Sequence, residues 1–252
     1  MQEFIEKIIK EAGELGLVFY QKGVSSSMKT HAHDLLTEAD TALSNFLVEK
    51  IHAAYPDHHI YSEEMATDIN PGAEYEWVID PIDGTWNFAQ HIPIWGILIA
   101  VVERGVTKYA ATYWPVDNHL YTAEKGKGAF LNGEPIRVSA KKELTGSVGN
   151  TFSSLTQPHA EAISKLTQIL FSKGAGIKNY SCMYNAMLTA RGVLDFYVSN
   201  GGLDYDHLAP LLICEEAGAV VTDTYGQPWK RGVHNIAMAN PAIHAELLTL
   251  LA

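Results

Sequence analysis

The chain has 252 residues, 47% of them hydrophobic and 19% charged, a composition typical of a globular protein with a substantial core. Twenty-nine acidic residues against eighteen basic ones give a formal net charge of −11. An acidic chain without a Lys/Arg cluster is poorly suited to bind nucleic acid or an anionic membrane surface. We therefore expect neither as a partner.

Targeting signals are not evident. The most apolar run, Pro93 to Val102, is far shorter than the ~20 residues that a membrane-spanning helix needs. Charges interrupt the opening sequence MQEFIEKIIKEAGELG, which therefore does not resemble a secretory signal. The two cysteines, Cys182 and Cys214, lack the spacing of a disulfide framework or a thiolate metal site. These features predict a cytoplasmic protein.

The first half of the chain begins with helical periodicity. Apolar residues recur at helical spacing over residues 2 to about 21, which predicts an amphipathic helix. Thr37 can cap a second helix that ends before Pro56 and has Asp40 in its first turn. Strands are expected at 60–61, 77–79 and 120–122, and a hairpin at 94–102 and 109–113, with its turn at 104–106.

The second half alternates helices with strands, which is typical of α/β layering. We expect helices at 158–172, 183–191, 206–217 and 241–251, and strands at 196–199, 219–222 and 235–239. The sequence has no internal repeat, so residues 1–252 are expected to form one domain. The stretch 132–146, which contains Pro and Gly, is the one candidate seam between subdomains.

The most informative segment is WVIDPIDGTWNF, at residues 77–88. An apolar strand should end at Asp80, and Pro81 should turn the chain there because its φ is fixed, so that Asp80 and Asp83 face one point. Hard cations bind carboxylate and carbonyl oxygens. Asp80, Asp83 and the carbonyl of Ile82 could therefore share a pair of Mg²⁺ ions.

The end of the same segment suits an anion. Gly84 permits close approach of the backbone to a ligand, and Thr85 begins a turn whose N–H groups would point at a phosphate. A simpler interpretation is a strand, a turn and a helix cap, because Asp, Pro and Gly all form turns. The aspartyl-phosphate mechanism is excluded, because the residue two before Asp83 is Pro81, which cannot act as a nucleophile.

This segment, with YSEE before it and DYDHLAPLLICEEAGAVVTD after it, resembles the inositol monophosphatase family. The likeness extends from Lys29 to about Asp223. It implies a Mg²⁺-dependent, lithium-sensitive phosphatase that forms a homodimer. It also implies an α/β (α+β) layered sandwich in which helix and sheet layers alternate.

The resemblance implies roles for individual residues. Glu63 would bind the first metal and hold the attacking water, and Asp80 would bridge two ions. The carbonyl of Ile82 would complete the first site, while Asp83 and Asp206 would hold the second. Asp40 would hydrogen-bond the reactive Thr85. Substrate contacts are implied at Lys29, Asp83, Gly84, Thr85, Cys182, Ser199 and Asp206.

Electrostatics points to metal ions without reference to the family. The four carboxylates of Glu63, Asp80, Asp83 and Asp206 would strongly repel a phosphate dianion in a cleft of low effective dielectric constant. Two divalent ions would neutralise them and lower the pKa of a bound water. We expect two or three Mg²⁺ ions and hydrolysis by water without a covalent intermediate.

Other chemically capable residues are expected to be structural or exposed. Histidines without a metal-ligand partner cluster are His31, His33, His58 and His59. Expected surface charges are Glu64, Glu215 and Glu216. Cys214 lies in an apolar helix, and at least two of Trp77, Trp86 and Trp95 should pack in the core.

The substrate alcohol is less determined than the reaction. The family usually has Gly-Ser/Thr-Ala-Ala where this chain has residues 180–183, YSCM, and a glutamate in place of Ser199. The pair Tyr205-Asp206, together with Cys182, resembles the histidinol-phosphate phosphatase branch, whereas Asn87-Phe88 resembles the inositol branch.

We therefore expect hydrolysis of a small phosphomonoester. Inositol 1-phosphate is the leading substrate, and histidinol phosphate, fructose 1,6-bisphosphate and a nucleotide 3′-phosphate are alternatives. A regulatory protein that binds transcription machinery and keeps a residual site is a further alternative. The intact acidic residues argue against a loss of catalysis.

Overall fold

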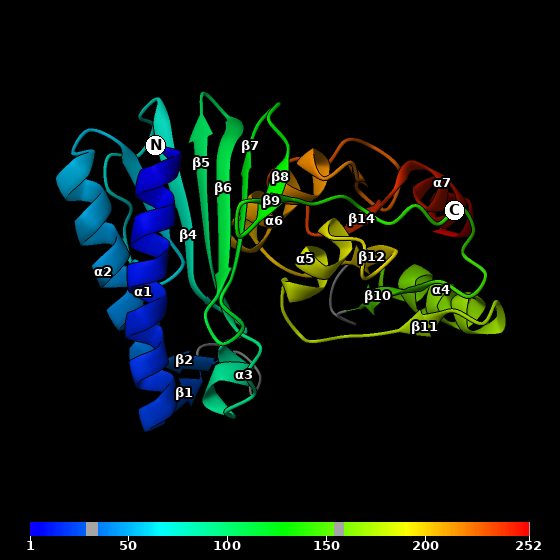
Figure 1. Cartoon of the computed structure of the whole chain (residues 1–252), viewed down its shortest axis with the longest axis horizontal. Helices are drawn as coiled ribbons and strands as arrows, with labels where there is room; N and C mark the ends of the chain where they lie inside the picture. Colours follow the sequence, from blue (N-terminus) through cyan, green and yellow to red (C-terminus); the bar gives the residue numbers. More distant parts are fainter. Residues whose placement is uncertain (29–34, 154–158, 252) are drawn as a thin grey trace.

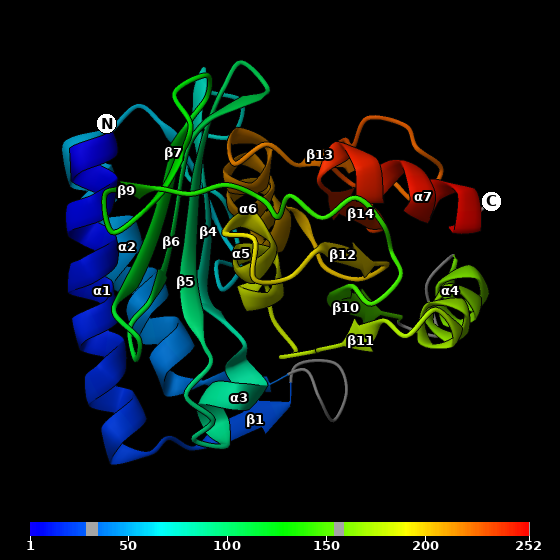
Figure 2. The ribbon, with the colours of Figure 1, turned by 45° about the vertical axis from the view of Figure 1, so that its right-hand side comes forward.

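The computed structural model describes residues 1–28, 35–153 and 159–251, and in this part of the chain helical and sheet layers alternate (Figures 1 and 2). Helices α1 (Gln2–Lys22) and α2 (Glu38–Ala54) cover one face of a seven-stranded sheet. Helices α5 (Tyr184–Ala190) and α6 (Asp204–Glu216) lie between that sheet and a five-stranded sheet. Helices α4 (Ala160–Ser172) and α7 (Pro241–Leu251) cover the far face of the second sheet. The predicted layered α/β sandwich is confirmed.

The seven-stranded sheet follows the order of the chain. Only its first two strands pair in parallel, and the rest are antiparallel. Its strands are β3 (His59–Ser62), β4 (Tyr75–Asp83), β5 (Gly96–Glu103), β6 (Val106–Trp114), β7 (His119–Glu124), β8 (Ala129–Leu131) and β9 (Glu134–Pro135). The predicted hairpin is β5–β6. Its turn residues Arg104 and Gly105 have φ of 48° and 79°, as a type I′ turn requires.

The five-stranded sheet is mixed. In spatial order it contains β11 (Gly176–Ile177), β10 (Val148–Phe152), β12 (Phe196–Ser199), β14 (Ile236–Ala239) and β13 (Val220–Thr222). A two-stranded sheet, β1 (Ser26–Met28) with β2 (Leu35–Thr37), lies near the short helix α3 (Thr85–Ala89) (Figure 1). The segment 136–147 connects the two large sheets. That the chain forms one domain, with a seam at 132–146, stays a prediction.

The structure corrects two predictions around the central motif. Strand β4 does not end at Asp80; it continues through Pro81 to Asp83, with a register shift against β5 between the two acids. An irregularity of this kind accommodates a proline, which has no N–H to donate to the ladder. Residues 85–89, expected to form a turn, form α3. Of the described helices, none combines the length and apolar character needed to cross a bilayer.

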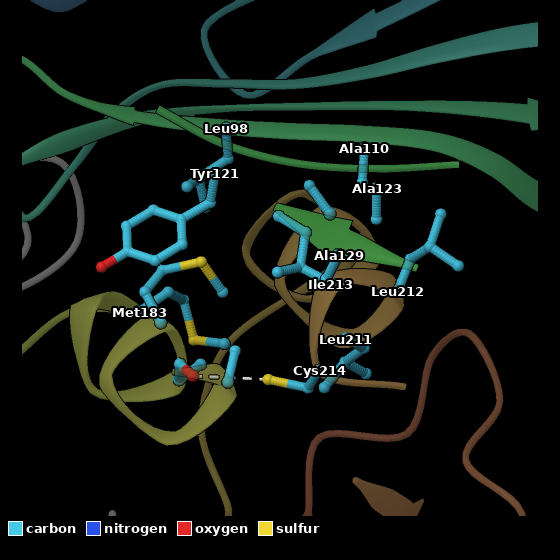
Figure 3. Close-up of a cluster of buried hydrophobic side chains, with 14 of the residues drawn as sticks. Leu98, Ala110, Tyr121, Ala123, Ala129, Met183, Leu211, Leu212, Ile213 and Cys214 are labelled. Atoms are coloured by element: carbon cyan, nitrogen blue, oxygen red, sulfur yellow. Dashed lines mark hydrogen bonds between the residues drawn. The ribbon is translucent and has the colours of Figure 1, made fainter. Parts of the chain in front are cut away.

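The core that faces the catalytic motif combines small and large side chains. Alanines of the seven-stranded sheet, including Ala110 and Ala123, leave room for Leu212 and Ile213 of α6 (Figure 3). Cys214 is buried in this cluster, and its thiol donates a hydrogen bond to the carbonyl of Ala186 at 3.3 Å. The prediction that Cys214 is a core residue is confirmed.

Helix α1 approaches the sheet closely because glycine stands at the contact. A Cβ atom added to Gly16 would lie 2.8 Å from the indole of Trp95, which is itself buried. No L side chain fits at this position without movement of the helix or the indole. The close packing of α1 therefore depends on Gly16.

Replacing Gly16 with alanine should destabilise the fold by about 1–2 kcal/mol, since overpacking outweighs the ~1 kcal/mol better helix propensity of alanine. The exposed Glu14→Ala change in the same helix is the control and should stay within about 0.5 kcal/mol of wild type. Urea denaturation measures both free energies of unfolding. A Gly16→Ala protein as stable as wild type would show that α1 can shift freely.

Candidate active site

Three carboxylates from two elements meet at one point. Asp80 and Asp83 stand at the end of β4 and are 2% and 5% exposed, while Asp206 lies in the first turn of α6. Each offers an oxygen, and these three atoms lie within 4.8 Å of one another. The donor set consists of oxygen atoms alone, which suits a hard cation such as Mg²⁺.

Glu63 joins this cluster from the neighbouring strand. Its N–H donates to the carbonyl of Ile79 at 3.0 Å, directly after β3. Since β3 and β4 run in parallel, Glu63 and Asp80 emerge at the same edge of the sheet, where their carboxyl groups are hydrogen-bonded. The four acids that the sequence indicated as metal ligands are thus brought together.

Crowding changes the ionisation of these acids. Burial and then the negative charges of Glu63, Asp83 and Asp206 raise the pKa of Asp80 well above its ordinary value. Burial and the charge of Asp206 raise the pKa of Asp83, which a hydrogen bond from the Met183 N–H partly offsets. A bound divalent cation would favour the charged carboxylates, so the residues present fit such an ion.

Thr85 is held beside the acids by Asp40. The Thr85 hydroxyl lies 3.1 Å from Asp40 Oδ1 and 2.9 Å from the carbonyl of Ile82, so its one hydrogen can be donated to either oxygen. Asp40 is fully buried and accepts the N–H of Thr37 at 2.8 Å and its hydroxyl at 2.5 Å. This is the capping box of α2, so the predicted cap at Thr37 is confirmed.

Gly84 lets two distant segments approach each other. It has φ 89° and ψ 38°, a left-handed conformation, and a Cβ here would lie 3.1 Å from the carbonyl oxygen of Ile94 and 3.3 Å from the Cβ of Cys182. Met183, the next residue, donates its N–H to Asp83 Oδ2 at 2.8 Å. Burial and the charge of Asp83 raise the pKa of the Cys182 thiol, which therefore stays protonated near neutral pH.

The remaining sequence candidates are placed differently. Ser199 is only 1% exposed, and its hydroxyl accepts the N–H of Gly201 at 3.1 Å, so it is engaged within its own loop. Lys29 lies outside the described residues, as do His31 and His33. A substrate contact by Lys29 or Ser199 stays a prediction.

The residues expected to be structural behave as such. The His58 ring accepts the indole N–H of Trp77 at 3.0 Å, and His59 lies 2.9 Å from Asp68. Trp77 and Trp95 are buried, whereas Trp86 is 40% exposed, which confirms two core tryptophans. Glu216, expected to be a free surface charge, instead accepts the N–H groups of Gly126 and Gly128 at 2.8 Å and so fixes the β7–β8 turn.

Sequence reasoning missed the groups that hold the site in place. The buried amide of Asn87 donates to the carbonyls of Ile94 and Tyr180, at 2.8 and 2.9 Å, and so ties α3 to the segment that precedes Cys182. Asp206 accepts the N–H of Leu203 at 2.6 Å, which caps α6. Arg231 belongs to no motif, and only its contacts in the fold indicate a role.

Volume alone would not have located this site. The largest groove, of about 750 Å³, lies between α1 and β7–β8, and none of the four acids lines it. A smaller cavity of about 190 Å³ is lined by Leu203, Asp204 and His207 at the start of α6, next to Asp206. The carboxylate cluster, rather than the largest groove, is therefore the candidate site.

Comparisons with known proteins agree with this placement. A family model described as the inositol monophosphatase family matches residues 1–252. A Thermotoga maritima protein named fructose-1,6-bisphosphatase/inositol-1-monophosphatase is 33% identical over 99% of this chain and 94% of its own. A Neisseria meningitidis serogroup B protein named putative Nus factor SuhB is 32% identical over 100% of this chain and 99% of its own.

A solved structure is similar along nearly the whole chain. It is that of the extragenic suppressor protein SuhB from Bartonella henselae, with a TM-score of 0.93 and 26% identity. The superposition covers 99% of this chain and 97% of the other. The layered arrangement is therefore shared with a protein solved by crystallography.

Without metal, the Asp80→Asn protein should be more stable than wild type at pH 8, because the substitution removes one of several mutually repelling acids. Since the folded-state pKa of Asp80 is raised, wild-type stability should fall as pH rises from the unfolded value of about 4 through that pKa. The difference should shrink towards pH 4. Urea denaturation in EDTA tests this, and identical pH profiles for the two proteins would contradict it.

Proposed function

The chain belongs to the inositol monophosphatase family and is a phosphatase, and we propose that it hydrolyses a small phosphomonoester with Mg²⁺ as its cofactor. Inositol 1-phosphate is the first candidate substrate. The observation that carries the proposal is the convergence of Asp80, Asp83 and Asp206 on one point beside Glu63. A set of carboxylates alone attracts cations and repels phosphate, so it suits phosphate chemistry only when cations are bound.

The proposed ligands fall into two sets. Glu63, Asp80 and the carbonyl of Ile82 would hold one ion, and Asp80, Asp83 and Asp206 would hold another; a third ion remains part of the proposal. When bound, Mg²⁺ neutralises the acids and the phosphate and lowers the pKa of a bound water. The same set of ions makes lithium sensitivity an expectation.

Thr85 and Asp40 would orient the attacking water. Asp40 is buried and already accepts two hydrogen bonds from Thr37, so it is suited to accept the Thr85 hydroxyl hydrogen as well. With its hydrogen directed at Asp40, the Thr85 oxygen keeps a lone pair for a proton from water. Glu63 would accept the second hydrogen of that water. Water would then attack phosphorus in line with the leaving alcohol.

The alcohol specificity would depend on the segment that contacts Gly84. Cys182 lies against Gly84 and near Asp83, so it is suited to face the leaving group. The name of the Thermotoga relative supports fructose 1,6-bisphosphate as an alternative substrate. Histidinol phosphate and a nucleotide 3′-phosphate remain alternatives for the same site. A homodimer and a cytoplasmic location also remain proposals.

A regulatory role is the second candidate, because a relative covering this chain in full is named a putative Nus factor. The acidic cluster argues that catalysis persists whatever partner is bound. A purified protein that releases no phosphate from any ester would favour the regulatory role. The following experiment separates the two.

Asp80→Asn should lower turnover more than a hundredfold, because this carboxylate would serve both ions. The assay is phosphate release with saturating Mg²⁺ from a panel of phosphomonoesters, repeated with Li⁺ and Ca²⁺ as expected inhibitors. Asp57→Asn, an exposed acid outside the cluster, is the control and should match wild type. Near-normal turnover of folded Asp80→Asn would remove Asp80 from the mechanism.

Cys182→Ala should shift substrate preference towards inositol 1-phosphate over histidinol phosphate, by about fivefold in the ratio of kcat/KM. Alanine is the residue typical of the inositol branch here, and a single contact group in a pocket is worth roughly 1–3 kcal/mol of discrimination. Cys214→Ala, which removes the buried thiol of the core, is the matched control and should leave the ratio unchanged. An unchanged ratio in Cys182→Ala would exclude contact with the alcohol.

A further inference from the structure

Arg231 bonds two acids that lie on different layers of the fold. Its Nη1 and Nη2 donate to the two carboxylate oxygens of Glu76, at 2.5 and 3.1 Å, and its Nε donates to Asp204 Oδ2 at 2.7 Å. The neighbouring Gly232 N–H donates to the other Asp204 oxygen at 3.0 Å. Arg231 thus fills both acids with charge-assisted hydrogen bonds, in the forked geometry that favours arginine over lysine.

The two acids belong to the elements that carry the candidate metal ligands. Glu76 is on β4, and because side chains alternate along a strand, it points to the same face as Val78 and Asp80. Val78 packs in the cluster that contains the core residues of α6. Asp204 is the first residue of α6, two before Asp206. Arg231 therefore links the strand of Asp80 to the helix turn of Asp206.

Charge gives this link its importance. Asp206 lies close to Asp80 and Asp83, and with no cation between them the carboxylates repel each other, which pushes the first turn of α6 away from β4. Glu76 and Asp204 would add to that repulsion. The guanidinium placed between them opposes it, and screening by water is limited because Glu76 and Asp204 are only 13% and 22% exposed.

The loop that presents Arg231 is itself fixed. The indole N–H of Trp229 donates to the carbonyl of Val233 at 2.8 Å, and the Val233 N–H donates to the carbonyl of Lys230 at 3.1 Å. Trp229 also packs edge-on against His207 of α6, with ring centroids 5.6 Å apart. Arg231 is therefore held by a rigid turn rather than by a loose surface loop.

We propose that Arg231 is a positioning residue that holds Asp206 at the distance from Asp80 and Asp83 at which the three carboxylates bind a divalent cation. This inference rests on the proposed metal site and adds a residue outside every recognised motif. Arg231 touches neither substrate nor reacting atoms. The buried core of α6 and the contact between Tyr61 and Tyr205, with ring centroids 6.1 Å apart, keep the helix folded without it.

Mn²⁺ binding tests the proposal without an activity assay. Free Mn²⁺ is counted by electron paramagnetic resonance during titration of wild type, Arg231→Met and Asp206→Asn. Arg231→Met should weaken the step that Asp206→Asn removes by about fivefold to tenfold, at the low end of the roughly 10–100-fold effects of groups that orient metal ligands. The other binding step should be unchanged.

Controls separate positioning from general stabilisation. Arg104→Met breaks an exposed ion pair with Glu74, at 2.9 Å, and should change no Mn²⁺ binding step. Arg231→Lys keeps the charge but loses the fork, so its Mn²⁺ affinity should fall between those of wild type and Arg231→Met. If Arg231→Met does not fold, Glu76→Gln, which keeps the shape of the acid, should weaken the same step by about threefold.

The outcomes are distinguishable. Wild type that binds no Mn²⁺ overturns the proposed metal site and this inference together. Wild type that binds Mn²⁺, with Arg231→Met (or Glu76→Gln in its place) binding it equally well, overturns the positioning role and leaves the proposed function standing. Equal weakening of both steps also overturns it, because that effect would be general destabilisation.

Discussion

Repulsion among carboxylates that are withdrawn from water is the constraint that the rest of this structure has to meet. Asp80 and Asp83 are buried at the end of β4, and Asp206 approaches them from α6. Burial and like charge both raise the pKa of the two strand acids. The fold must therefore supply enough apolar packing and enough hydrogen bonds to hold groups that would otherwise separate.

Backbone hydrogen bonds fix the orientation of these acids. Asp83 accepts the N–H of Met183, Asp206 caps α6 through the N–H of Leu203, and Asp40 caps α2 while it holds Thr85. One carboxylate oxygen in each case is committed to the backbone, so the side chain has few alternative rotamers. A site built in this way needs little rearrangement to bind an ion, which is the purpose of preorganisation.

The sequence predicted the long elements well and the short ones poorly. Helices α1 and α6 and the β5–β6 hairpin have enough turns or alternations for their periodicity to be read. Strands of two to five residues, such as β8 to β11, carry no readable period, because their pairing partners rather than their own residues decide them. Helix α3 and the continuation of β4 past Pro81 depended on the irregular pairing of β4 with β5.

The sequence by itself determined the chemistry of the motif, because Asp80, Ile82, Asp83, Gly84 and Thr85 are neighbours along the chain and local geometry keeps them together. It also identified Glu63 and Asp206 as partners, through their resemblance to a family. Only the tertiary structure decided that Ser199 turns into its own loop, that Cys182 lies against Gly84, and that Arg231 joins Glu76 to Asp204. Those contacts join residues far apart in the chain, so they exist only once the layers have packed, and no local pattern of residues encodes the free energy of that packing.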